Sequence, residues 1–367
     1  MLWWQEFPEW LTMIDNRFTR HPFITFLAIM AFLVLIAEFT LRLVGPDILE
    51  FAYNFRQVYR YHDRWYTDFE PGSATRIALK DSSGSYFFNF LITINEYGFK
   101  DHDRRLDSHL TPGKGEKIIH TIGDSFTMGW GVGNDSSYPA ILNFNLPQEY
   151  RVLNLGLNGF GTIAATEKSM IIGRQFAPVI VVYLATENDY SDDERAVVHS
   201  RRPSLVHGYY KILNWLRQHT YVVSAPFALY WWTYYRGSIV TKAKDFVENK
   251  HLHRFVSTNF KLQNDPSSVS DPRMGEYSKS ALLKYSEFLK KSGVHFLVVL
   301  HGTGKVVKDL FAFCREHQID ACLIEVPSVF KLARDGHFNL LGNYRLAEFV
   351  RNKLVKRNWI KLEKPNN

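Results

Sequence analysis

The chain has 367 residues, of which 46% are hydrophobic and 15% aromatic, and its formal net charge is +7. This length and composition exclude a disordered chain and allow one large domain or two ordinary ones. Its two cysteines, Cys314 and Cys322, are too few for a zinc set or a disulfide framework. They leave two alternatives open, a single bridge or two reduced thiols.

Part of the positive charge lies in the tail 351–364, which has six Lys or Arg residues and one Glu. This tail is either a solvated helix face or a surface attracted to an anionic membrane or glycan. No recognisable nucleic-acid-binding motif accompanies the charge, so a nucleic-acid partner is not expected.

Residues 23–45 predict a transmembrane anchor, because only Glu38 and Arg42 interrupt their apolar character. About 20 apolar residues are enough to span a bilayer. A cleaved signal peptide is the alternative, but 22 residues precede the segment and no small-x-small cleavage site follows it. Glu38 and Arg42 are four residues apart, so on a helix they share a face and can pair.

The leader, residues 1–22, has large apolar residues at helical spacing, among them Trp3, Phe7 and Trp10. This pattern predicts an amphipathic helix that lies in the membrane interface or packs onto the protein itself. Arginines occur on both sides of the predicted anchor, so their count does not determine its orientation.

Residues 46–115 are predicted to be a connecting region with short strands. Residues 116–360 then alternate apolar runs with helical patterns, which predicts an α/β domain with a central parallel sheet covered on both faces. The predicted strands are 117–123, 150–156, 178–185, 294–300 and 321–326, and the predicted helices include 162–176, 278–293, 306–318 and 341–357.

The alternation lapses over an insertion at about 195–275. Its segment 209–240 is aromatic and largely uncharged, so a second membrane span is one interpretation. Pro226, Arg236 and Gly237 argue against a span. The preferred interpretation is an insertion packed over the active-site edge of the sheet.

Polar residues follow four of the predicted strands, at the sheet edge where reactive groups collect in parallel sheets. Ser125 is the candidate nucleophile, His337 its base and Asp335 the carboxylate that orients the imidazole. The backbone N–H groups of Ser125 and Gly159, with the Asn188 amide, are candidate oxyanion donors. Each of these features alone also fits a turn or a helix cap. Their joint appearance at strand ends is what indicates a site.

The segments IGDSFTMGWGV, LNLGLNGFGT, ATENDYSDD and DGHFNLLGNYRLAE resemble the successive blocks of the SGNH (GDSL-type) hydrolases, over roughly 116–355. The resemblance implies a flavodoxin-like three-layer sandwich, the catalytic and oxyanion roles given above, and neither metal nor other cofactor. An anchor before such a domain is similar to bacterial envelope members. It implies a single-pass inner-membrane protein whose catalytic domain is periplasmic.

Two positions depart from the family pattern. The third block usually begins with glycine, and Thr186 stands there, where a side chain would narrow the pocket or tilt Asn188. Many members place the acid three residues before the base. Here that position is Arg334, and Asp335 is two residues before His337.

The leading hypothesis is a serine esterase or O-acyltransferase that acts through an acyl-serine on an acylated envelope glycan or lipid, with a membrane acyltransferase as a candidate partner. The alternative is a catalytically inactive binding or assembly subunit of a membrane complex. A metal site at His251 and His253 is disfavoured, because i, i+2 spacing does not put both on one helix face.

Overall fold

The computed structural model describes residues 21–80, 84–100, 115–236, 274–332 and 335–361. Nearly all of the predicted leader, Arg334, and the part of the insertion that contains His251 and His253 lie outside the described residues.

A five-stranded parallel sheet forms the centre of the C-terminal part, in the order β6-β5-β7-β8-β9. In chain order this is the 2-1-3-4-5 arrangement of flavodoxin-like folds. The strands are β5 (Lys117–Gly123), β6 (Tyr150–Asn154), β7 (Pro178–Ala185), β8 (His295–His301) and β9 (Ala321–Ile324). The predicted strands are therefore confirmed to within a few residues at their ends.

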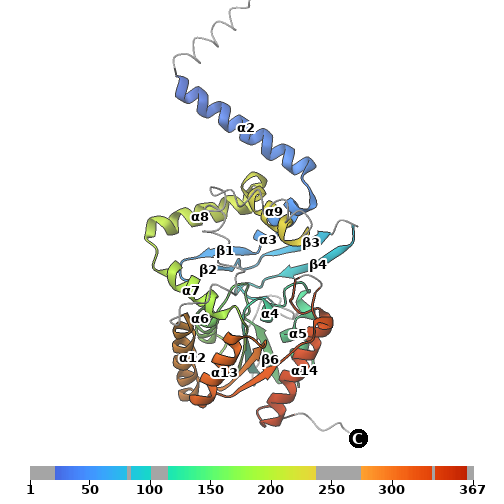
Figure 1. Ribbon diagram of the computed structural model, residues 1–367, viewed down its shortest axis with the longest axis vertical. Helices are drawn as coiled ribbons and strands as arrows, with labels where there is room; N and C mark the ends of the chain where they lie inside the picture. The colour runs from blue at the N-terminus through green and yellow to red at the C-terminus, as the bar shows by residue number, and fades with distance from the viewer. Residues whose placement is uncertain (1–20, 81–83, 101–114, 237–273, 333–334, 362–367) are drawn as a thin grey trace, which may run out of the picture.

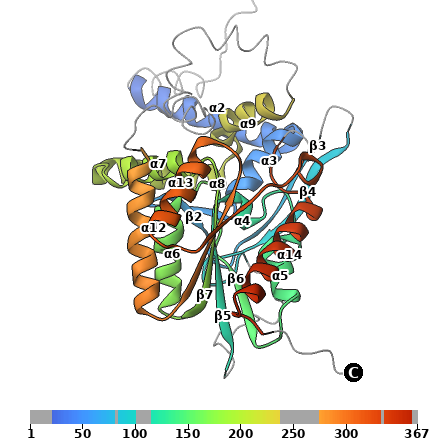
Figure 2. The same cartoon turned by 60° about the horizontal axis from the view of Figure 1, so that its bottom comes forward.

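Helices cover both faces of this sheet (Figures 1 and 2). On one side lie α6 (Thr162–Gly173), α12 (Met274–Lys291) and α13 (Lys305–Glu316), and on the other α5 (Tyr138–Phe144) and α14 (Leu340–Lys356). Successive residues of β5 supply both cores, because Ile118 and Ile122 belong to the first and Ile119 to the second. The predicted three-layer α/β fold is confirmed, and we call this unit the sheet domain.

Cys314 lies in one of these two cores and Cys322 in the other. Both are buried free thiols. Of the two alternatives open from the sequence, the structure therefore has the reduced pair.

Above the carboxyl ends of the strands lies a second unit, which we call the cap layer (Figure 1). It consists of α3 (Asp47–Arg56), the hairpin of β1 (Tyr59–His62) and β2 (Tyr66–Phe69), the hairpin of β3 (Ala74–Lys80) and β4 (Tyr86–Thr93), and the helices α8 (Ser204–His219) and α9 (Tyr221–Arg236). The segment predicted as a connection thus forms structure of its own. Its α3 residues Phe51 and Phe55 belong to the same buried cluster as Ile118 of the sheet domain.

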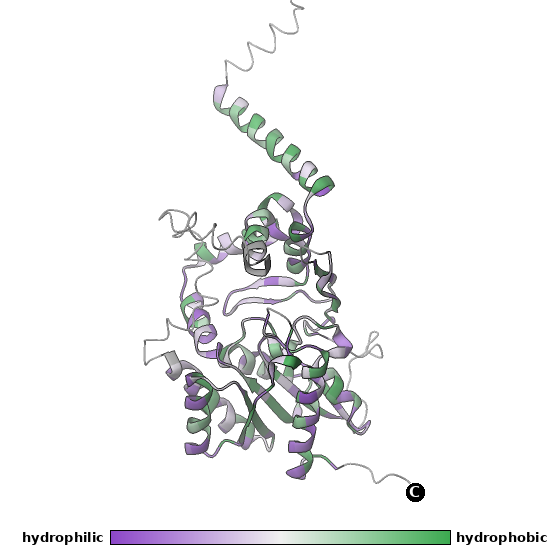
Figure 3. Ribbon diagram, turned by 45° about the vertical axis from the view of Figure 1, so that its right-hand side comes forward, coloured by the Kyte–Doolittle hydropathy of each residue, from purple (hydrophilic) through white to green (hydrophobic). Residues whose placement is uncertain are grey.

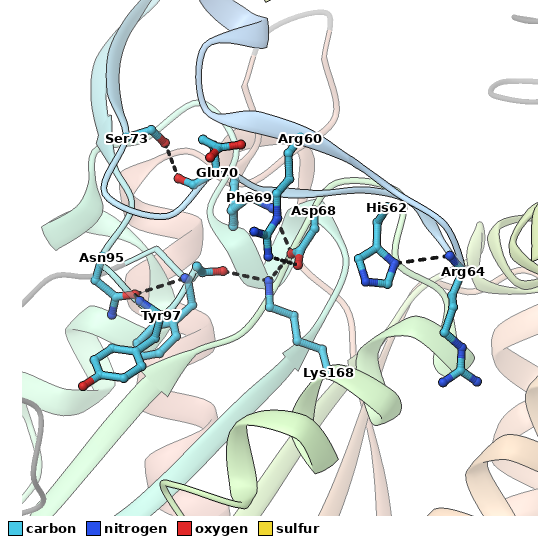
Figure 4. Close-up of polar contacts among 12 residues, drawn as sticks. Arg60, His62, Arg64, Asp68, Phe69, Glu70, Ser73, Asn95, Tyr97 and Lys168 are labelled. Carbon is cyan, nitrogen blue, oxygen red and sulfur yellow. Dashed lines mark hydrogen bonds and ion pairs between the residues drawn. The ribbon is translucent and has the colours of Figure 1, made fainter. Parts of the chain in front are cut away.

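A buried ion pair joins the two units (Figure 4). The Lys168 ammonium of α6 lies 2.6 Å from a carboxylate oxygen of Asp68 on β2 and also donates to the Gly98 carbonyl at 2.8 Å. Burial alone would raise the pKa of Asp68, but the ammonium and its hydrogen bond hold that pKa below its usual value. Asp68 therefore stays ionised, and the pair fixes the hairpin to α6.

The predicted anchor is a single helix, α2 (Pro22–Val44), none of whose residues is buried (Figure 3). Among the described residues it is the one helix long and apolar enough to cross a membrane. The predicted pair is confirmed, since Arg42 Nε lies 2.8 Å from Glu38 Oε1. Glu38 also accepts the N–H groups of Tyr221 (3.0 Å) and Val222 (2.9 Å). The base of α2 is thereby fixed to the start of α9.

Within the described residues, the aromatic insertion forms two helices, α8 and α9, on either side of Thr220. Helix α8 has 16 residues, fewer than the roughly 20 that span a bilayer, and Pro226 lies inside α9. Instead α9 packs on α3, with the Trp231 ring 5.5 Å from that of Phe51. The insertion thus belongs to the layer over the carboxyl edge of the sheet.

Candidate active site

A tight turn presents Ser125 at the edge of the sheet. Strand β5 ends at Gly123, and the short helix α4 (Ser125–Met128) begins two residues later. Gly123 has φ of 144°, and a Cβ there would lie 2.5 Å from Thr127 Oγ1 and 2.6 Å from the Leu184 carbonyl oxygen. Only glycine fits both the backbone and the space. Asp124 caps α4 by accepting the N–H of Phe126 at 2.9 Å.

The structure brings the predicted nucleophile, base and orienting acid together. Ser125 Oγ lies 2.7 Å from His337 Nε2, across 212 residues of sequence. His337 Nδ1 makes a short contact with Asp335 Oδ1. Because the carboxylate accepts a hydrogen bond from the Nδ1–H group, the proton stays on Nδ1 and the Nε2 lone pair is directed at the serine hydroxyl. The two-residue spacing from Asp335 to His337 is therefore compatible with the required contact.

Trp130 also holds this acid, and sequence reasoning missed it. Its indole Nε1 donates to the second oxygen of Asp335 at 3.2 Å. The ring of Phe126 lies 4.7 Å from that of His337, so the imidazole is bounded on one side. The signal was present in the sequence, because Trp130 lies in the same GDSFTMGWG block as the nucleophile.

Two of the three predicted oxyanion donors are unengaged backbone groups. Within the part of the chain that the structure describes, neither Ser125 nor Gly159 uses its N–H in a hydrogen bond. Gly159 has φ of 75°, and a Cβ added there would have no heavy atom within 4 Å. Its side of the turn is therefore open, which is what close approach of a substrate requires.

The third predicted donor, Asn188, is engaged elsewhere. Its amide nitrogen donates to Asp124 Oδ2 at 3.1 Å and to Asp192 Oδ2 at 2.7 Å, which uses both hydrogens. Thr186 Oγ1 lies 2.7 Å from Asn188 Oδ1 and 2.8 Å from Asp124 Oδ2. Thr186 thus fixes the orientation of Asn188. The oxyanion role of Asn188 stays a prediction, and it requires release of the bond to Asp192.

Buried carboxyl groups support the site from behind. Burial raises the pKa of Asp124, and burial together with the nearby Asp124 raises that of Asp189 well above its usual value. Both carboxyl groups lie within hydrogen-bond distance of Thr186 Oγ1, and a proton on one of them removes the cost of two neighbouring buried charges. Burial raises the pKa of Asp193 to about 6, and this side chain accepts the N–H groups of Thr162 and Ile163 at the start of α6. The acid-rich stretch ENDYSDD was the sequence signal for this cluster.

A cavity of about 250 Å³ lies beside Gly159. Arg56, Trp65 and other residues of the cap layer form one wall, and Asn158 with the helix α7 (Asp189–Ser200) forms the other. The candidate site therefore consists of the Ser125–His337–Asp335 contacts in the sheet domain and a cavity, lined by residues of both units, that includes Gly159.

Comparisons with known proteins give partial matches of fold. A lipolytic protein of the G-D-S-L family from Desulfitobacterium hafniense DCB-2 is 12% identical with a TM-score of 0.37, over 65% of this chain and 99% of its own. TesA is 14% identical with a TM-score of 0.35, over 65% and 98%. Est24, a carbohydrate acetylesterase from Sinorhizobium meliloti, is 11% identical with a TM-score of 0.34, over 66% and 100%.

No family model and no curated protein sequence matches the chain. The identities and scores of the similar structures carry no conclusion about activity. Function therefore has to be argued from the geometry of the site itself.

Proposed function

We propose that the protein is a serine-dependent acyl-ester hydrolase or O-acyltransferase of the SGNH type. The observation that carries the proposal is the continuous contact from Ser125 Oγ to His337 Nε2 (2.7 Å) and from His337 Nδ1 to Asp335. A serine hydroxyl is a weak nucleophile, and a base at hydrogen-bond distance with its second nitrogen held is the arrangement that activates it.

In the first half of the reaction, Ser125 Oγ attacks the acyl carbon while its proton passes to His337 Nε2. The carbonyl oxygen becomes an oxyanion, which the N–H groups of Ser125 and Gly159 would stabilise, with Asn188 as a third donor if it leaves Asp192. Collapse of the intermediate breaks the ester C–O bond, and His337 returns the proton to the leaving alkoxide. The acyl group is now on Ser125.

In the second half, His337 takes a proton from the acceptor as that acceptor attacks the acyl-serine. The bond to Ser125 Oγ breaks, and the serine recovers a proton from His337. Water as acceptor gives hydrolysis, and a sugar hydroxyl gives O-acyl transfer. For transfer, a membrane acyltransferase is the partner that would supply the acyl group.

We further propose that α2 anchors the protein in the bacterial inner membrane, with the sheet domain on the periplasmic side. None of the residues of α2 is buried, its only charged residues are the Glu38–Arg42 pair, and Glu38 bonds its base to the cap layer. Helix α8 supports this arrangement, because Leu205, Tyr209, Ile212 and Trp215 are exposed on one face, as in interfacial helices. The substrate would then be an acylated glycan or lipid at the membrane surface.

The full chain in detergent or nanodiscs tests the activity, with p-nitrophenyl acetate and an acetylated oligosaccharide as substrates. Acetate release shows hydrolysis, and acetyl groups on an added sugar acceptor show transfer. We expect one of the two, and we expect Ser125→Ala to abolish it. Protease treatment of spheroplasts tests the placement. Cleavage of the sheet domain supports the periplasmic side, and full protection contradicts it.

One observation favours the alternative of an inactive binding or assembly subunit. Both amide hydrogens of Asn188 are directed at carboxylates, which leaves two backbone donors for an oxyanion. Under this alternative, the folded protein would release no acetate, and Ser125→Ala would leave every measured property of the wild type unchanged.

A further inference from the structure

The cavity beside Gly159 has a chemistry that the reaction itself does not explain. Three arginines and two carboxylates line it. Asp192 contacts Arg195, whereas neither Arg56 nor Arg202 forms an ion pair with any described residue. Apart from the Asp192–Arg195 pair, the wall has two positive groups, Arg56 and Arg202, and one negative group, Glu194. Its net charge is therefore positive.

Two donors in this wall are buried without acceptors. Arg56 Nε and Trp65 Nε1 have no hydrogen-bond partner within the described ranges. Trp65 is 6% exposed, so bulk water does not solvate its indole N–H freely. A buried donor left unsatisfied destabilises the fold, and two in one cavity indicate a ligand with acceptor oxygens.

Two acceptors in the same wall are also unsatisfied, Asn158 Oδ1 and His199 Nδ1. His199 Nε2 lies 3.2 Å from the His62 carbonyl oxygen and 3.1 Å from the Tyr61 hydroxyl. Because the carbonyl can only accept, we place the proton on Nε2, and Nδ1 then has a free lone pair. Burial lowers the pKa of His199 to about 4, which keeps the ring neutral at pH 7. These acceptors suit the hydroxyl groups of a ligand.

The same groups argue against an acyl chain in the cavity. A hydrocarbon there would leave the Arg56 and Trp65 donors without acceptors, at a cost in desolvation. The remaining wall is largely aromatic, with Tyr59, Tyr66 and Tyr210. The face of a tyrosine ring can pack on the C–H face of a sugar ring, and its hydroxyl group can bond a sugar hydroxyl.

We propose that this cavity binds an anionic sugar unit of the substrate, a ring that carries a carboxylate or a phosphate group. Arg56 and the Trp65 indole bind the acidic group, Asn158 and His199 accept from the sugar hydroxyls, and Arg202 adds long-range attraction. The inference rests on the proposed function, because the sugar bound here places a neighbouring ester beside Gly159 and Ser125.

Calorimetric titration of full-length Ser125→Ala in nanodiscs tests the proposal, since this variant would keep an ester ligand intact. The ligands are the methyl glycosides of O-acetylated glucuronic acid, O-acetylated glucose 6-phosphate and O-acetylated glucose. We expect at least one acidic sugar to bind about tenfold or more tightly than the neutral one. The two acidic ligands distinguish a carboxylate from a phosphate.

Further substitutions in the Ser125→Ala background assign the preference to the cavity. Arg56→Gln should abolish it. Trp65→Phe, which keeps the ring but removes the N–H, should reduce it several-fold. Arg64→Gln is the matched control. Arg64 precedes Trp65 in the turn between β1 and β2, but it pairs with Glu167 at 2.7 Å instead of lining the cavity. This variant should bind as the parent does. Circular dichroism identifies any variant that fails to fold. If Arg56→Gln does not fold, the affinities of Trp65→Phe alone test the assignment of the preference to the cavity.

Equal affinity for acidic and neutral sugars would overturn the inference, as would a preference that survives both Arg56→Gln and Trp65→Phe. Displacement of the sugar by a long-chain fatty acid would assign the cavity to an acyl chain. The proposed function has a separate readout, which is acetate release or acetyl transfer to an added sugar acceptor by the wild type. Either activity without a preference for acidic sugars rejects the cavity proposal alone. The preference without either activity rejects the proposed hydrolase or transferase alone.

Discussion

The sheet domain and the cap layer differ in how their residues hold them together. In the sheet domain, continuous apolar strands lie between amphipathic helices, and all three members of the proposed triad come from this unit. The cap layer is built from two two-stranded hairpins and three helices that pack through aromatic pairs such as Phe51 and Trp231. The difference suggests a division of roles, in which the sheet domain carries the chemistry and the cap layer selects what reaches it.

Substitutions in the triad should have the largest effect. His337→Ala should lower kcat on p-nitrophenyl acetate by about 10⁴- to 10⁶-fold, and Asp335→Asn by about 10⁴-fold, because each removes an essential part of the proton transfer. Steady-state kinetics measure both. Ser200→Ala, on an exposed serine of α7, is the control and should keep full activity. Activity within tenfold of wild type in His337→Ala would refute the role of the triad.

Breaking the contact between the two units should have the next largest effect. Lys168→Met leaves the buried Asp68 carboxylate with only the exposed Arg60 guanidinium, at 3.4 Å, as a charged partner. We expect the free energy of unfolding to fall by about 3 kcal/mol, the lower end of the range for a broken buried pair. Lys117→Met removes an exposed pair with Glu149 (2.8 Å) and should leave the free energy of unfolding nearly unchanged, because water and salt screen an exposed pair. Urea denaturation of both variants gives the comparison. Equal losses would mean that Lys168 does not fix the cap layer.

A buried histidine makes the sheet domain sensitive to acid. His120 bonds Ser169 Oγ (2.8 Å) and the Phe176 carbonyl (2.9 Å), and burial lowers its pKa from 6.5 to about 4. As the pH falls, His120 is therefore protonated in the unfolded chain before it is protonated in the folded protein. The free energy of unfolding falls as the pH drops from 6.5 towards 4. Between pH 7 and pH 5 the loss should be about 2 kcal/mol.

The substitution His120→Gln isolates this contribution, because glutamine keeps a polar side chain but does not titrate. Unfolding free energies at pH 7 and pH 5 should differ by about 2 kcal/mol less in the variant than in wild type. The lowered pKa values of His199 and His301 leave a remaining slope in both proteins. Identical pH dependence of variant and wild type would show that His120 does not contribute.

The smallest effect is expected at Trp130. Trp130→Phe keeps the ring but removes the N–H that Asp335 accepts at 3.2 Å. We expect kcat to fall about tenfold with little change in KM, because the acid is held less firmly while substrate contacts remain. A change confined to KM would instead place Trp130 at the substrate.

The sheet and most of the site could be predicted from the sequence, for a physical reason. Buried parallel strands such as Pro178–Ala185 are continuous apolar runs, and their carboxyl ends meet at one edge. The positions of Ser125 and His337 after two of these strands therefore predict that their side chains lie close together. The cap layer was predicted less completely. Short strands within 46–115 and an insertion over the active-site edge were expected, but the pairing of the strands into hairpins was not, because four-residue strands such as β1 and β2 carry little local pattern. The orientation of Asn188 depends likewise on Asp192 and Thr186, one turn away and two residues before it.

Covalent labelling tests the central claim, an activated Ser125, most directly. The full chain is treated with a fluorophosphonate, its intact mass is measured and the modified peptide is sequenced, with Ser125→Ala and His337→Ala treated in parallel. We predict one adduct per chain, located on Ser125, absent from Ser125→Ala and strongly slowed in His337→Ala. A folded wild-type protein without an adduct, or with an adduct on another serine, would contradict the account.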